Sequence, residues 1–201
     1  KPTGGDINRK STNLHHGVVI SDQFMALIES ATREEGFDDS WDLIDPNSGR
    51  VVKTVSAKTL WVKLIQNRVE TGEPYIMFGD TVQNALPECQ KEKGLKVNHS
   101  NLCSEITLAT DEDRTAVCCL SSVNLEEFDE WQHDPNFIPD LVAMLDNVLT
   151  YFIDNAPREL WRASYSAMQE RSIGLGAMGF HAYLQRHHMP FEGITAKSAN
   201  M

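Results

Sequence analysis

The sequence predicts a mixed α/β protein, because segments with helical spacing alternate with short apolar runs that are typical of strands. The expected helices share an apolar residue every three or four positions and lie at about 22–35, 57–71, 137–155, 158–170 and 175–188. The expected strands are rich in Val, Ile and Tyr and lie at 17–20, 51–55 and 75–78. With 201 residues, of which 41% are hydrophobic and 23% charged, the chain can bury a core.

The strand-like run 17–20 leads directly into the first expected helix. Ser21 or Asp22 can cap a helix over 22–35, and Gly36 ends it. The segment 41–55 follows, in which Asp, Pro, Asn and Gly residues separate two runs rich in β-formers. Such a pattern predicts a hairpin.

The second helix has equally clear limits. Ser56 can cap a helix over 57–71, and Gly72 stops it. The run 75–78 then has the composition of a short buried strand. Residues 79–96 are mostly polar and predict a loop.

The C-terminal half is expected to be mainly helical. The segment 137–155 keeps a helical apolar stripe, and Pro139 suits its first turn. Pro157 breaks this helix, and further helical regions are expected at 158–170 and 175–188.

Between these halves lies a segment with unusual polar chemistry. Asn101, Cys103 and Glu105 occupy alternate positions of an apolar-flanked stretch, expected to be extended over about 101–108. In an extended chain, residues two apart point to the same side, so the amide, thiol and carboxylate would face one cavity. An acidic turn at 111–114 separates this stretch from a second extended one, 115–124, which contains Cys118.

Composition limits the other functions that the chain could have. A net charge of -11 without a Lys/Arg cluster argues against general nucleic-acid binding. No apolar run approaches the roughly 20 residues that cross a bilayer. The abrupt ends at Lys1 and Met201 lead us to expect that the chain is part of something longer.

The four cysteines do not form a recognisable framework. The length, the core and the missing signal peptide disfavour secreted disulfides, and the absence of a C-x2-C pair disfavours zinc. For Cys89 and Cys119, burial as small hydrophobic residues is the expected role. Cys103 differs because of its polar neighbours.

Residues 174–179 match the letters G-x-G-x-x-G of dinucleotide-binding proteins. The fingerprint also needs a preceding apolar strand and an acidic residue about 20 positions later, and the sequence before Gly174 is polar. We therefore expect a tight turn that lets a helix pack closely. The pairs His15-His16 and His187-His188 lack metal-ligand spacing and are expected to be solvated or packed.

The segments SNLCSEI (100–106) and AVCCLSSVNL (116–125) closely resemble the large, catalytic (alpha) subunit of class I ribonucleotide reductase. Further stretches agree in family order, namely 3–6, 22–25, 70–75 and 171–176. The resemblance implies that residues 1–201 are part of the ten-stranded α/β barrel of the ribonucleotide reductase and glycyl-radical enzyme type, incomplete in this chain. It also implies a finger loop over about 98–125.

The resemblance further implies a role for each polar residue. Cys103 would be the thiyl radical that abstracts the 3′ hydrogen of a ribonucleoside diphosphate. Glu105 would accept the 3′-hydroxyl proton, and Asn101 would hold the substrate hydroxyls. Cys118 would be one half of the redox pair, with its partner upstream of Lys1. Cys119 is a departure from the family pattern, and the alignment of the flanking residues favours Cys118 over it.

The same resemblance implies cofactors and partners outside this segment. No cofactor is expected on the segment itself, the radical coming from a metal-containing small (beta) subunit. Allosteric nucleotides (ATP and dNTP) would bind elsewhere in the full subunit, which would be a homodimer. Thioredoxin or glutaredoxin would supply electrons, the location would be cytoplasmic, and the isolated chain would be inactive.

Three other hypotheses stay open on the sequence. The chain could be a non-catalytic remnant or interaction module of the same fold. It could belong to a cobalamin-dependent class II reductase, although Leu102 between Asn101 and Cys103 favours class I. A zinc-bound redox module is the least favoured of these hypotheses.

Overall fold

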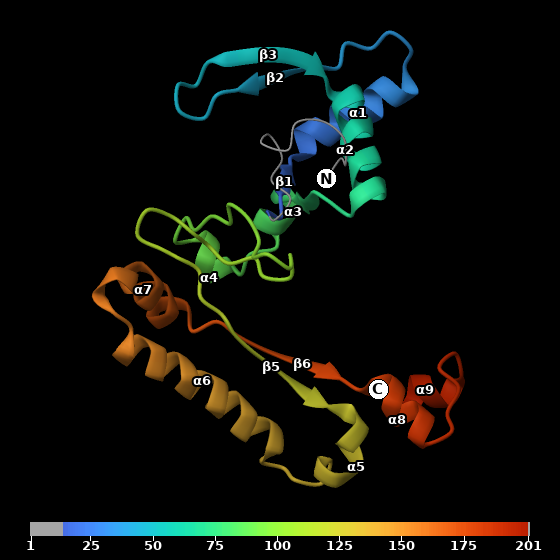
Figure 1. Ribbon diagram of the computed structural model, residues 1–201, viewed down its shortest axis with the longest axis vertical. Coiled ribbons are helices and arrows are strands. Elements are labelled where there is room, and N and C mark those ends of the chain that lie inside the picture. Colours follow the sequence, from blue (N-terminus) through green and yellow to red (C-terminus); the bar gives the residue numbers. More distant parts are fainter. Residues whose placement is uncertain (1–13, 201) are drawn as a thin grey trace. The chain divides into compact units, whose positions relative to one another are not determined.

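The computed structural model describes residues 14–200, and the chain divides into two compact units, one up to Thr110 and one from Asp111 onward. Helices and strands alternate along both units (Figure 1). The expected mixed α/β class is therefore confirmed. The family-like residues 3–6 lie outside the described residues.

The first unit is built on a pair of parallel strands. Strand β1 (Gly17–Ile20) pairs with β4 (Tyr75–Phe78), so that Gly17 lies opposite Tyr75. The connection between them contains helices α1 (Asp22–Arg33) and α2 (Ala57–Thr71), which pack against each other. Both strands and the second helix have the predicted bounds, whereas α1 ends two residues early.

The helix ends follow the predicted capping chemistry. Ser21 Oγ accepts the N–H of Phe24 at 3.1 Å, and Ser56 Oγ accepts the N–H of Thr59 at 3.0 Å. Gly72 ends α2 with a φ of 78°, a backbone conformation that glycine adopts without steric cost. These local contacts explain why the helix limits could be read from the sequence.

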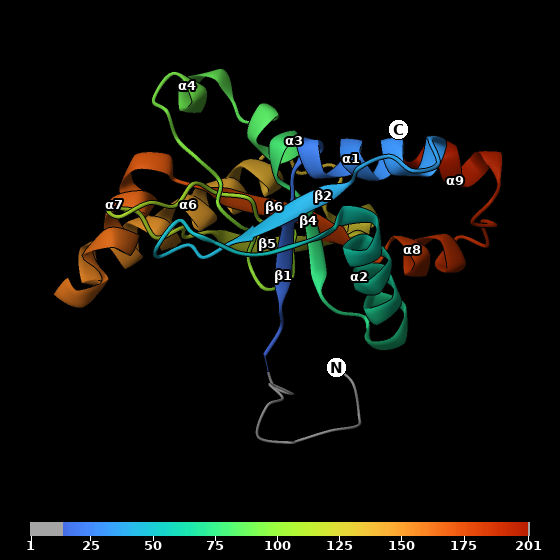
Figure 2. The same cartoon turned by 90° about the horizontal axis from the view of Figure 1, so that it is seen from above.

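The hairpin predicted between α1 and α2 is also present. It consists of β2 (Ser40–Ile44) and β3 (Val51–Ser56), which are antiparallel with a bulge at Leu43/Ile44. In Figure 2 the hairpin leads from α1 to α2. Trp41 packs against the buried cluster of Ile20, Phe24, Ile28 and Ala57, and a second buried cluster of the unit consists of Met77, Leu86 and Val97.

The prediction of a loop over 79–96 is wrong. The segment contains two short helices, α3 (Gly79–Asn84) and α4 (Glu88–Lys91). Helix α3 is joined to a segment distant in sequence, because the Asp80 carboxylate accepts the N–H of Asp22 at 2.7 Å. A polar composition alone does not reveal such a contact.

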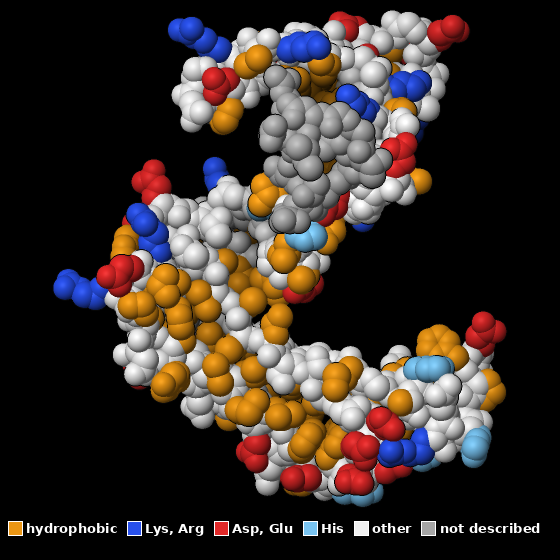
Figure 3. Space-filling model, in the orientation of Figure 1, with side chains coloured by type: hydrophobic (Ala, Val, Ile, Leu, Met, Phe, Trp, Pro, Cys, Tyr) orange, Lys and Arg blue, Asp and Glu red, His pale blue; other side chains and the backbone are white. Residues whose placement is uncertain are grey.

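The second unit is a strand–helix–strand arrangement. Strand β5 (Cys119–Asn124) pairs in parallel with β6 (Ile173–Met178), and helix α6 (Phe137–Asn155) contacts both strands. Leu145 and Leu149 of α6 are buried, and α6 has the predicted bounds. Hydrophobic side chains also gather on the outer surface over α6 (Figure 3).

The remaining elements of this unit are short. They are η2 (Leu125–Glu127), α5 (Phe128–Trp131), η3 (Arg158–Leu160), α7 (Trp161–Glu170), α8 (Phe180–Arg186) and α9 (Ile194–Ala199). Together η3 and α7 occupy the region predicted to be helical at 158–170.

The predicted helix over 175–188 and the tight turn at its start are wrong at the N-terminal end. Gly174 and Gly176 lie within β6, and the helix begins only at Phe180. A methyl group at Gly174 would come within 2.6 Å of Leu120 Cδ2. The glycines therefore permit close approach of β5, a pairing partner more than fifty residues away in sequence.

Across residues 14–200 the strands form three two-stranded sheets, so no closed barrel is present in this part of the chain. No helix among these residues is long and apolar enough to cross a membrane.

Candidate active site

The segment that carries Asn101, Cys103 and Glu105 is a tight turn, which corrects the prediction of an extended stretch over 101–108. The N–H of Ser104 donates to the carbonyl of Asn101 at 3.2 Å, and Ser104 has a φ of 74°. The N–H of Asn101 donates to the carbonyl of Ile106 at 3.1 Å. The chain therefore reverses its direction here, and Asn101, Cys103 and Glu105 do not lie on one face of a strand.

The side-chain amide of Asn101 holds this turn from within. Its Nδ2 donates to Glu105 Oε1 at 2.8 Å, and its Oδ1 accepts the N–H of Ile106 at 3.1 Å. Cys103 lies between the two partners in sequence, and its side chain is exposed. The turn thus carries an exposed thiol at the residue midway between the two partners of an amide–carboxylate hydrogen bond.

The base of the loop is anchored separately from its tip. Asn98 Nδ2 donates to the carbonyl of Thr110 at 2.7 Å, and the N–H of Thr110 donates to the carbonyl of Lys96 at 3.1 Å. Val97 and Ala109 are buried beside these bonds. Apolar burial and hydrogen bonding therefore fix both ends of the loop, while its tip remains exposed.

The two adjacent cysteines belong to the second unit. Cys118 immediately precedes β5 and Cys119 begins it, and both side chains are half-buried. The N–H of Cys119 donates to the carbonyl of Ser172 at 3.3 Å, which starts the pairing with β6. The expected extended stretch 115–124 is thus a strand only from Cys119. Cys89 is exposed in α4, so its predicted burial is wrong.

A buried ion pair fixes the segment that leads to Cys118. Arg114 Nη1 lies 3.0 Å from Glu170 Oε1, with side chains only 11% and 7% exposed. The Arg114 guanidinium also lies over the ring of Tyr165, 5.1 Å from its centroid. Sequence reasoning missed this pair, because no local pattern relates residues 56 positions apart.

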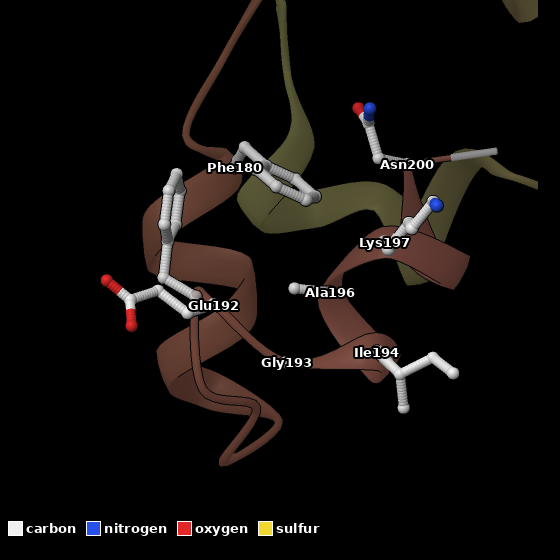
Figure 4. A pocket seen from close by; sticks show the side chains of 8 residues that line it. Phe180, Glu192, Gly193, Ile194, Ala196, Lys197 and Asn200 are labelled. Carbon is white, nitrogen blue, oxygen red and sulfur yellow. The ribbon is translucent and has the colours of Figure 1, made fainter.

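Two cavities lie away from the predicted site residues. One of about 590 Å³ lies beside α8 and α9, and its lining includes Phe180, Ala196, Lys197 and Asn200 (Figure 4). Another, of about 470 Å³, is mostly apolar and is lined by residues of β1, β2 and α2 that include Trp41. Within residues 14–200 no cluster of three or more His, Cys, Asp or Glu side chains could hold a metal ion.

Comparison with known proteins gives a consistent result. The sequence profile described as "Ribonucleotide reductase, barrel domain" matches residues 1–201. The chain is 53% identical over 198 residues to a putative ribonucleoside-diphosphate reductase large subunit of Frog virus 3, covering 97% of this chain and 34% of that protein. It is 43% identical over 244 residues to the ribonucleoside-diphosphate reductase large subunit of Invertebrate iridescent virus 3, covering 98% and 39%.

Among solved structures, the chain is similar to the class Id ribonucleotide reductase alpha subunit of Actinobacillus ureae. The TM-score is 0.71 at 34% sequence identity, and the match covers 92% of this chain and 32% of that one. The chain therefore spans between about a third and two fifths of the length of these relatives.

Proposed function

Because the chain belongs to the family of ribonucleotide reductase large-subunit barrel domains, we propose that it supplies the radical-bearing part of a ribonucleoside-diphosphate reductase. The substrate would be a ribonucleoside diphosphate and the product the 2′-deoxyribonucleotide. The remaining segments of the large subunit would complete the barrel around the Cys103 turn.

The observation that carries the proposal is the geometry of the turn. Asn101 and Glu105 are joined by a 2.8 Å hydrogen bond on either side of an exposed thiol. The second N–H of the Asn101 amide and the second oxygen of the Glu105 carboxylate have the chemistry to bind neighbouring hydroxyls of a ribose. Such a pair orients the sugar so that the sulfur meets one hydrogen.

The reaction that this arrangement supports begins at Cys103. Its thiyl radical takes the 3′ hydrogen atom, which forms the S–H bond and leaves a carbon radical. Glu105 accepts the 3′-hydroxyl proton, and the 2′-hydroxyl takes a proton from the thiol pair described below and leaves as water. After the 2′ carbon has been reduced, Glu105 returns its proton to the 3′ oxygen, and Cys103 returns the hydrogen atom to the 3′ carbon and is again a thiyl radical.

The two electrons that reduce the 2′ carbon come from a thiol pair in this proposal. Cys118 and a second cysteine outside the chain each give one electron and one proton, and a disulfide forms between them. Thioredoxin or glutaredoxin then reduces the disulfide. The support for Cys118 is its position directly before β5, where strand pairing and the Arg114–Glu170 ion pair hold the backbone.

The proposal also includes partners that this chain does not contain. A small (beta) subunit with a metal centre would generate the radical, and allosteric nucleotides would bind elsewhere in a dimeric, cytoplasmic large subunit. These partners follow from family membership and supply nothing to the geometry described above.

The test is reconstitution. The chain is co-expressed with flanking large-subunit segments, mixed with a small subunit and reduced thioredoxin, and assayed for deoxyribonucleoside diphosphate. Cys103→Ser should abolish product formation because an alcohol O–H bond is too strong to exchange hydrogen with the ribose. Cys89→Ser alters another exposed cysteine and is the matched control, which should retain activity.

Two results would contradict the proposal. Full activity of the Cys103→Ser assembly would exclude the radical role and leave the interaction-module hypothesis. Product formation by the isolated 201-residue chain with small subunit and thioredoxin would contradict the dependence on other barrel segments.

A further inference from the structure

The imidazole of His99 lies against the backbone of β1 at Gly17, where both residues are exposed and a Cβ would have room only if the ring moved. A methyl group at Gly17 would lie 2.5 Å from His99 Nε2 and still closer to Cε1. Non-bonded carbon and nitrogen atoms do not approach so closely, because they prefer separations of about 3.5–4.0 Å. The Cε1–Nε2 edge of the imidazole therefore occupies the space in which any other residue would place its Cβ.

The other side of the same ring is bonded to the start of the turn. His99 Nδ1 accepts the N–H of Ser100 at 2.8 Å, and Ser100 Oγ donates to the carbonyl of Asn101 at 3.1 Å. Gly17 itself is fixed by the pairing of β1 with Tyr75 of β4. A short path of contacts thus joins the parallel strands to Asn101 through one imidazole ring.

We propose that His99 is a positioning residue, which seats the turn carrying Asn101, Cys103 and Glu105 on the first residue of β1, and that Gly17 is required because it leaves room for the imidazole. The bonds within the turn close it, and the His99–Gly17 contact holds its N-terminal end against β1, so that loss of this contact also loosens the bonds made by the N–H groups of Asn101 and Ile106. We call the His99–Gly17 contact the seat of the turn. Its catalytic importance rests on the function proposed above, but the contact itself is a property of the fold.

Three variants separate the packing from the hydrogen bond. Gly17→Ala places a methyl group against the ring and forces His99 to move. His99→Asn retains an acceptor near the Nδ1 position but removes the Cε1–Nε2 edge. The double variant combines the methyl group with the space that the shorter side chain leaves, so it should restore the seat that Gly17→Ala destroys.

The first measurement is amide hydrogen exchange of the 201-residue chain. Gly17→Ala should accelerate exchange at Asn101 and Ile106 about tenfold, as expected for an overpacked site, and the double variant should return it to near the wild-type rate. Gly174→Ala is the matched control, because it also places a methyl group of a strand residue, here in β6, against a neighbouring side chain, that of Leu120 in β5. His133→Ala controls for loss of an exposed histidine.

The second measurement uses the reconstituted reductase. Gly17→Ala should lower kcat about tenfold, and the double variant should recover most of it. Recovery by a second substitution is not expected if Gly17→Ala merely destabilises the strand. The reconstituted wild-type reductase could be inactive while the exchange rates of the variants change as expected. That result would contradict the proposed function and support the His99–Gly17 contact as the seat of the turn.

The seat is contradicted if exchange at Asn101 and Ile106 is unchanged in Gly17→Ala, or if the double variant is as perturbed as the single one. If Gly17→Ala does not fold, exchange at Asn101 and Ile106 in His99→Asn and in the double variant tests the seat instead. Unaltered exchange in His99→Asn together with an unfolded double variant would also contradict it.

Discussion

The two cysteine-bearing segments are held in place by opposite means. The turn around Cys103 is closed by hydrogen bonds between residues no more than five apart, and its thiol is exposed. The segment at Cys118 is half-buried and depends on residues more than fifty positions away, through β6 and the Arg114–Glu170 pair. The hydrogen bonds that close the first segment are therefore local in sequence, whereas the contacts that hold the second come from distant residues.

This difference matches the chemistry proposed for each cysteine. A residue that must meet one hydrogen of a substrate gains from a turn whose shape is defined locally. A cysteine that must form and break a disulfide needs a backbone anchored to the rest of the fold, because disulfide geometry tolerates little displacement. Disturbing one anchor at a time therefore tests whether the two segments are independent.

The largest effect is expected at the buried ion pair. Arg114→Met leaves Glu170 without its partner at 7% exposure, and we expect a loss of about 3 kcal/mol in the free energy of opening of β5. Amide hydrogen exchange at 119–124 measures the loss. Exchange at Asn101 and Ile106 should not change.

The matched control is the exposed pair of Arg33 and Glu29 on α1, where Arg33→Met should change stability by less than about 0.5 kcal/mol. Equal effects at both pairs, or faster exchange at Asn101 in Arg114→Met, would show that the two segments are not independent.

A smaller and more local effect is expected in the turn. Asn101→Ala removes both amide contacts and leaves the N–H of Ile106 without the acceptor Oδ1, which should cost about 1–2 kcal/mol locally. Exchange at Ile106 should rise about tenfold while exchange in β5 stays constant. Asn155→Ala, which removes an exposed amide contact at the end of α6, is the control and should leave Ile106 unaffected.

The smallest expected effect is a loss of stability of the second unit at acid pH. The hydrogen bond from Arg171 lowers the pKa of Asp146, and Arg171 directly precedes the Ser172 carbonyl that bonds Cys119. A lowered folded-state pKa gives stability that is present above the usual carboxyl pKa and is lost as the pH falls through the lowered value, below about pH 4.

The melting temperature of the second unit should therefore fall more between pH 5 and pH 3 in wild type than in Asp146→Asn, and 1 M salt should reduce that difference. In the first unit the pKa of Asp39 is lowered mainly by hydrogen bonds from the Lys58 backbone N–H and the Ser56 hydroxyl, so salt should affect it less. Identical acid profiles for wild type and Asp146→Asn would contradict this role of Asp146.

Local signals in the sequence predicted much of the fold. The limits of α2 and α6 follow from capping residues, proline and apolar spacing, all within a few positions of the helix ends. The predictions made from the sequence were wrong at 79–96 and 174–179, where Asp80 bonds to α1 and Gly174 lies against Leu120. Both depend on residues more than fifty positions away, and no periodicity or composition reports such contacts.

The sequence by itself determined which residues carry the candidate chemistry, because an amide, a thiol and a carboxylate two positions apart and a later thiol are properties of residue type and spacing. Only the tertiary structure decided how they are presented. It replaced an expected strand face by a turn that Asn101 closes, and it showed His99 against Gly17 and Arg114 against Glu170. The physical reason is the distance in sequence between the residues in contact. The spacing of residue types reports contacts between residues a few positions apart, whereas packing between distant segments follows from the fold as a whole.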